Sequence, residues 1–240
     1  MVQVVLERDY VMKIRIKFSK TGNVKYVGHL DTMRLFQRAI KVAKLPVGYS
    51  QGFSPHSLVY FALPLSVGMS SSGEYMEIVM AEPITPEEVK ERLSKVMVSG
   101  ISLLDVFEVE EKTSSLMSLV QGADYKMMLK VPGHEEITAD VLEEKVRQSE
   151  ELIVLKKGKK GIAPVDIKPL ILESNFEQVD DCIAIDLKVY AGSSKNLSPD
   201  LFVKALLGDL SYELQVMRKE LYTEGDNGLV PIYTVGRVNE

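Results

Sequence analysis

The 240-residue sequence lacks several features that define specialised classes of protein. It has one cysteine, Cys182, and no tryptophan. A single cysteine excludes an internal disulfide framework and is typical of a reducing compartment. No apolar run approaches the roughly 20 residues that span a bilayer, and residues 1–11 lack the basic and apolar regions of an export signal. We therefore expect a cytoplasmic protein without a membrane contact.

Motifs that bind nucleotides, metals or reactive substrates are also missing. The chain has no G-x-x-x-x-G-K-S/T phosphate loop and no G-x-S-x-G nucleophile turn. Its three histidines and one cysteine have none of the short paired spacings of zinc sites. A radical SAM cluster needs three cysteine thiolates, so this chain cannot itself be such a catalyst. We expect no metal and no cofactor, and we do not favour an enzyme.

The charge is distributed unevenly along the chain. The formal net charge is −5. Residues 1–60 nevertheless carry ten lysines and arginines against three acidic residues, whereas the remainder carries 19 against 31. The acidic total argues against a general polyphosphate binder, but a basic first quarter permits a local anion site. A solvated basic face without a ligand is the alternative interpretation.

Residues 12–111 contain an ordered set of strand and helix signals. Apolar and basic residues alternate from Met12 to Lys20, as in a half-buried strand. Thr85, followed by Pro86 and two glutamates, is a typical helix start. The predicted strands cover 12–20, 57–65, 73–82 and 101–111, and the predicted helices cover 29–44 and the segment that follows Thr85. This β-α-β-β-α-β order is that of a ferredoxin-like unit.

The same order recurs after a polar segment. A strand, a helix capped by Thr138, two strands across 153–190, another helix and a last strand follow one another. Pro199 lies 113 positions after Pro86 in matching helix starts, and the first strands have the same offset. Chance alignment of two proline-containing helix starts is the alternative. The sequence predicts an α+β fold of two tandem ferredoxin-like (βαββαβ) domains with antiparallel sheets, 1–111 and 123–240, joined by the linker 112–122.

The helix predicted over 29–44 carries a candidate anion site. Its apolar residues recur at helical spacing and would face the sheet. Gly28 and His29 lie at its start, where free backbone N–H groups favour anions. The basic residues of its solvent side are Arg34, Arg38 and Lys41, with Lys44 close by. Together they predict a phosphate or carboxylate site, unless His29 is only a helix-entry residue that bonds the backbone.

The loop "LPVGYSQGFSPH" (45–56) is longer than most connections, and long loops are often functional. Gly52 permits backbone angles that other residues avoid. Tyr49 and Phe53 offer flat faces on which a base could stack, or else they cover the end of the core. His56 would meet His29 only if the loop ran back along the helix, which the sequence leaves open.

A second basic segment, "LKKGKKG" (155–161), is predicted on a turn between strands. Its lysines are Lys156, Lys157, Lys159 and Lys160. They could contact a phosphate backbone, or they could keep the edge of a hairpin soluble.

Residues 25–78, with "GHLD" and "GFSPH", resemble the radical-SAM-associated domain of unknown function, which many bacteria carry fused C-terminally to a radical SAM protein. Segments 164–171 and 192–202 resemble its later parts. The resemblance implies an accessory domain of a radical SAM enzyme, with a hint of RNA from neighbouring genes, and assigns no residue a role. The family often has a proline where Ser57 stands. Residues that match the motif are Gly28, His29, Asp31, Arg34, Gly52, Phe53, Pro55 and His56.

These observations lead to three hypotheses. The first is an accessory binding module for a radical SAM protein, engaging RNA or an anionic RNA-linked substrate through the basic helix and the aromatic loop. The second is a protein–protein interaction module without RNA binding. The third is a metal-independent endoribonuclease resembling the CRISPR repeat-processing enzymes. His29 would then act as an acid–base group, with Tyr49 or His56 assisting.

Overall fold

The computed structural model describes residues 12–158 and 161–238. The strands are β1 (Met12–Lys20), β2 (Val59–Phe61), β3 (Ser70–Met80), β4 (Ile101–Val109), β5 (Gly122–Lys130), β6 (Ile153–Gly158), β7 (Gly161–Asp166), β8 (Ile171–Val179), β9 (Cys182–Tyr190), β10 (Glu213–Gly225) and β11 (Gly228–Pro231). The helices are α1 (His29–Val42), α2 (Pro86–Ser94), α3 (Leu116–Leu119), α4 (Ala139–Gln148) and α5 (Pro199–Leu207), and the 3-10 turns are η1 (Gly22–Tyr26), η2 (Lys168–Leu170) and η3 (Ile232–Thr234).

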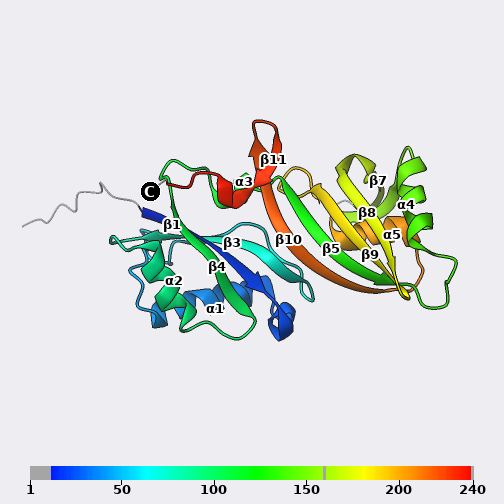
Figure 1. The fold of residues 1–240 in the computed structure, drawn as a ribbon. Coiled ribbons are helices and arrows are strands. Elements are labelled where there is room, and N and C mark those ends of the chain that lie inside the picture. The colour runs from blue at the N-terminus through cyan, green and yellow to red at the C-terminus, as the bar shows by residue number, and fades with distance from the viewer. Residues whose placement is uncertain (1–11, 159–160, 239–240) are drawn as a thin grey trace, which may run out of the picture.

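The fold is α+β and is built on one large sheet that is mostly antiparallel (Figure 1). The strand order is β4-β1-β3-β10-β5-β9-β8, with β2 added to β3 and β11 added to β10. Among the strands of the described residues, only β3 and β10 pair in parallel. In Figure 1, α1 and α2 cover one side of the β4-β1-β3 part, whereas α4 and α5 cover one side of the β5-β9-β8 part.

The helix starts that the sequence predicts are confirmed by their caps. The hydroxyl of Thr85 accepts a hydrogen bond from the N–H of Glu88, and Thr138 and Ser198 make the equivalent bond three residues ahead. Each bond satisfies one of the backbone donors that an isolated helix start leaves free. The first helix is shorter than predicted, because it ends at Val42.

Two predicted strand regions differ from the observed ones. The strand predicted over 57–65 is reduced to the three residues of β2, because the chain then leaves β3 and buries Ala62 and Leu65 in the core of the second half. The region 153–190 holds four strands instead of two. The extra pair, β6 and β7, is a separate hairpin inserted before β8.

The segment 112–122 is not a loose connection. It contains α3, and Leu116 and Val120 are buried in the core of the second half. The chain also returns to the first half at its other end, because Arg15 in β1 donates hydrogen bonds to the carbonyls of Ile232 and Val235. The two parts of the sheet are therefore tied together at several points.

The seam between β3 and β10 is short and tightly packed. Only two residue pairs match in parallel register, Ser70 with Met217 and Ser71 with Arg218. Beside them, a Cβ atom at Gly73 would lie 2.4 Å from the carbonyl oxygen of Lys219. Glycine is therefore required here by the close approach of the β10 backbone.

A buried ion pair crosses the same seam. The Nε of Arg218 donates to Oε1 of Glu74 at 2.8 Å and its Nη2 donates to Oε2 at 2.5 Å. Nη2 and Nη1 also donate to the carbonyls of Leu63 and Pro64. Arg218 is 2% exposed and Glu74 is 5% exposed, so the pair must hold its charges almost without water.

We predict that Gly73→Ala destabilises the fold, because the added methyl group has no space against β10. Overpacking of this kind costs about 1–3 kcal/mol. Urea unfolding measures the change, with Gly158→Ala as the control, since a Cβ there would lie 3.8 Å from its nearest neighbour. Equal midpoints for the two variants would contradict a tight seam.

We predict that Glu74→Gln lowers the free energy of unfolding by about 3 kcal/mol, because it leaves the buried guanidinium of Arg218 without a counter-charge. Glu177→Gln is the matched control, since this glutamate is exposed on β8 and exposed substitutions change stability by about 0.5 kcal/mol or less. Chemical denaturation followed by circular dichroism compares them. A loss no larger than that of the control would show that the pair is dispensable.

Candidate functional site

The outer face of α1 carries the predicted basic row. Phe36, Ala39 and Ile40 are buried against the sheet, so the opposite side of the helix faces solvent. Arg34, Arg38 and Lys41 are exposed, as is Lys44 just after the helix. The helical periodicity therefore placed this row correctly.

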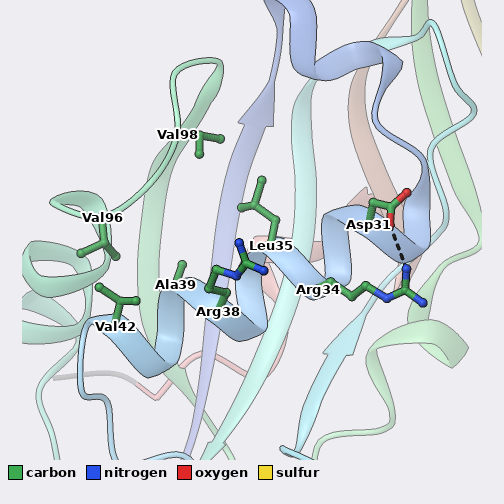
Figure 2. Close-up of a pocket in the computed structure, with 8 residues that line it drawn as sticks. All are labelled: Asp31, Arg34, Leu35, Arg38, Ala39, Val42, Val96 and Val98. Atoms are coloured by element: carbon green, nitrogen blue, oxygen red, sulfur yellow. Dashed lines mark hydrogen bonds and ion pairs between the residues drawn. The ribbon is translucent and has the colours of Figure 1, made fainter.

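A shallow groove of about 390 Å³ lies beside this row (Figure 2). It runs between α1 and the segment that joins α2 to β4. Its apolar residues are Leu35, Ala39, Val42, Val96 and Val98, and its charged residues are Asp31, Arg34 and Arg38. Apolar surface flanked by arginines suits a ligand that has both flat apolar and anionic parts.

The arginines and the lysine of the row differ in their pairing. Arg34 donates to the carboxylate of Asp31 at 3.0 Å, one turn away on the exposed surface. Among the described residues, the side chains of Arg38 and Lys41 have no hydrogen-bond or ion-pair partner. These two charges are available to an external anion, and Arg34 is available at the small cost of an exposed pair.

The loop after α1 is anchored to the sheet at its base and closed by its own hydrogen bonds toward its tip. The N–H of Gly48 donates to the carbonyl of Val79 at 2.8 Å, and the N–H of Leu58 donates to the carbonyl of Gly48 at 2.8 Å. At the tip, the hydroxyl of Ser50 lies 2.8 Å from Nδ1 of His56 and accepts the backbone N–H of His56. The loop is thus a closed turn on the end of the sheet where β3 finishes.

The aromatic residues of this loop point outward. Tyr49 is 55% exposed and Phe53 is fully exposed. Gly52 has a φ of 122°, which other residues rarely adopt, and so permits the turn that presents Phe53. The alternative that Tyr49 and Phe53 cover the core is wrong for this structure, because neither contributes to a buried cluster.

His29 lies at the opposite end of α1 from this loop. It is the first residue of the helix, next to the N-cap Gly28, and its ring meets Phe61 edge-on at 5.7 Å. Burial lowers the pKa of His29 below its ordinary value of 6.5, against the opposing effect of the Glu74 carboxylate. The 14-residue helix extends about 20 Å, so His29 and His56 do not share one site.

The second basic segment is a hairpin edge. Lys156 is exposed on β6, and the backbone of Lys157 pairs with Ile162 of β7. Lys159 and Lys160 lie outside the described residues. Among the described residues, no helix is long and apolar enough to cross a membrane, and no group of three His, Cys, Asp or Glu side chains could hold a metal ion.

Sequence reasoning missed the acidic residues of β3. Glu74 and Glu77 are buried where they pair with Arg218 and Arg15. The signal was present in "GEYMEIVM", where charged residues stand inside a strand that is otherwise apolar. A buried carboxylate needs a partner, so the strand could have been matched with the basic residues of β1.

Comparison with solved structures gives distant matches. A chain of the Cbf5-Nop10-Gar1 complex is 9% identical with a TM-score of 0.46, over 87% of this chain and 48% of that one. An unknown protein from Galdieria sulphuraria is 10% identical with a TM-score of 0.25, over 87% and 99% of the two chains. DyPB from Rhodococcus jostii RHA1 is 11% identical with a TM-score of 0.23, over 87% and 93%.

The present chain thus spans about half the length of the chain from the Cbf5 complex. At these TM-scores the likenesses carry no conclusion about function. A search of curated proteins gives no match. A family model does match, over residues 13–199, which include the basic helix, the aromatic loop and the β3 side of the seam. The chain belongs to this family, described as an uncharacterized protein conserved in bacteria (DUF2344).

Proposed function

We propose that this protein is a binding module for RNA or an anionic RNA-linked substrate, and that it serves a radical SAM protein as an accessory domain. The observation that carries the proposal is that exposed basic side chains on α1 are followed by exposed aromatic rings in the next loop. Arg38 and Lys41 offer charges without partners among the described residues, and Tyr49 and Phe53 offer exposed rings. Cationic grooves with aromatic faces are typical of proteins that bind single-stranded nucleic acid.

The proposed architecture is two tandem ferredoxin-like units that share one sheet. In each half the first strand lies between the last and the third strand of that half, in the orders β4-β1-β3-β2 and β10-β5-β9-β8. The hairpin of β6 and β7 is an insertion in the second unit. This arrangement leaves α1 and its loop at the outer side of the first unit, where a large partner has access.

Cleavage is less well supported than binding. The endoribonuclease hypothesis needs His29 together with Tyr49 or His56, yet these groups lie at opposite ends of α1. Acid–base catalysis requires them within hydrogen-bond reach of one substrate. A protein-docking role without RNA is the remaining alternative, and it differs from RNA binding in its response to salt.

We predict that total bacterial RNA binds with an affinity that falls steeply as salt rises, because bound phosphates release counterions. The double variant Arg38→Gln/Lys41→Gln should lower the log–log slope by about 1 to 2 units. Filter binding over a salt series measures this slope. Lys195→Gln/Lys204→Gln is the control, since it removes two exposed lysines of the second half. A slope that is unchanged in the first variant, or equally reduced in the control, refutes the α1 site.

We predict that Phe53→Ala weakens RNA binding by about 1–3 kcal/mol through the loss of a stacked base, with the salt slope preserved. Fluorescence anisotropy with a labelled single-stranded RNA measures the affinity. Tyr26→Ala is the control, because this aromatic residue is exposed on η1 outside the loop. Equal effects of the two substitutions would show that the loop has no special role.

A further inference from the structure

A cavity of about 540 Å³ lies beside β2, against a different face of α1 from the basic row. Its walls come from the start of α1, from β2 with the adjoining part of β3, and from the segment that contains α3. Small-molecule sites in proteins have volumes of about 300–1,000 Å³ and are mostly apolar with a few placed polar groups. This cavity has that size and that composition.

Glu77 supplies the strongest polar group of the cavity. It is 4% exposed, and its Oε1 accepts hydrogen bonds from Nε and Nη2 of Arg15 at 3.0 and 2.8 Å. Within the described part of the chain, its Oε2 has no partner. No fully buried side-chain nitrogen or oxygen there lacks a partner, so Oε2 is open to the cavity that Glu77 lines. This oxygen is a charged acceptor that can bind an N–H or O–H donor of a ligand.

Tyr60 stands directly opposite Glu77 in the antiparallel register of β2 and β3. It also lines the cavity, and its hydroxyl has no hydrogen-bond partner among the described residues. Val79, Leu116 and Met117 form apolar walls on the same face of the sheet, the face turned away from α1. Methionine thioethers adapt to flat rings and contact them favourably. A donor–acceptor pair on one side and soft apolar walls on the other suit a planar ligand.

The charges around the cavity favour a neutral ligand. Arg15 balances the carboxylate of Glu77, and the Lys13 ammonium is already bonded to the carbonyl of Glu111 at 2.5 Å. Burial lowers the pKa of His29 and so favours its uncharged imidazole. An anion would face the free oxygen of Glu77, and a cation would face the nearby Arg15 and Lys13.

We propose that this cavity binds a neutral, amino-substituted heteroaromatic ring. The amino group donates to Oε2 of Glu77, the hydroxyl of Tyr60 donates to a ring nitrogen, and Val79, Leu116 and Met117 enclose the ring. The site is separate from the basic row and does not depend on RNA binding.

The absence of tryptophan gives a direct test. The free base 2-aminopurine is a neutral, fluorescent amino-heteroaromatic ring, and its emission can be followed without tryptophan background. We expect saturable binding to the full chain, and at least tenfold weaker competition by purine, which lacks the amino group, because a hydrogen bond to a charged acceptor has about this value. Absence of saturation, or equal competition by purine, overturns the proposal.

Two variants locate the binding. Tyr60→Phe should weaken 2-aminopurine binding about fivefold, and Glu77→Gln should reduce the preference over purine about tenfold. Tyr26→Phe is the matched control, because it removes the hydroxyl of another exposed tyrosine and should change nothing. Should Glu77→Gln fail to fold, the comparison of Tyr60→Phe with Tyr26→Phe still decides. If these two variants bind alike, the ligand does not occupy this cavity.

Discussion

The pairing of β3 with β10 is the contact on which the architecture depends. Each half has its own core, yet the sheet is continuous only because two residues of each strand match in parallel at the seam. So short a ladder supplies few hydrogen bonds. The close backbone approach at Gly73 and the buried pair of Arg218 with Glu74 add packing and charge at the same point. Burial of charge stabilises only weakly in net terms, but it disfavours other alignments that would leave either group unpaired.

Internal ion pairs also explain much of the uneven distribution of charge along the sequence. Arg15 and Lys17 belong to the basic first quarter, but they face away from α1 and pair with Glu77 and Glu220. Their charges are therefore used inside the molecule. The charges of Arg38 and Lys41 are different, because the helix holds them on its outer side. The basic residues of the first quarter are thus of two kinds. Some form ion pairs within the protein and others are exposed on its surface, and the sequence alone does not distinguish them.

Local signals in the sequence were sufficient for several elements. A hydroxyl cap followed by an acidic first turn identified the starts after Thr85 and Thr138, since capping depends on residues three positions apart. The outer row of α1 followed from helical periodicity in the same way. The exposure of Phe53 and the distance between His29 and His56 could not be predicted, because they depend on where the loop is anchored on β3. The pair of Arg218 with Glu74 joins residues 144 positions apart, so the local sequence indicates a buried carboxylate at Glu74 but does not identify its partner.

The way the end of the described chain closes over β1 has a consequence for how the protein is made. The guanidinium of Arg15 donates hydrogen bonds to the carbonyls of Ile232 and Val235, which lie 217 and 220 positions later in the sequence. Contacts of such high sequence separation form slowly, because the connecting chain must lose its freedom first. On the ribosome, the early strands would emerge long before the residues that seal them. The first half is therefore completed only after residues 232–235 have been synthesised, and a chain stalled before them would leave the guanidinium of Arg15 without these two carbonyl partners.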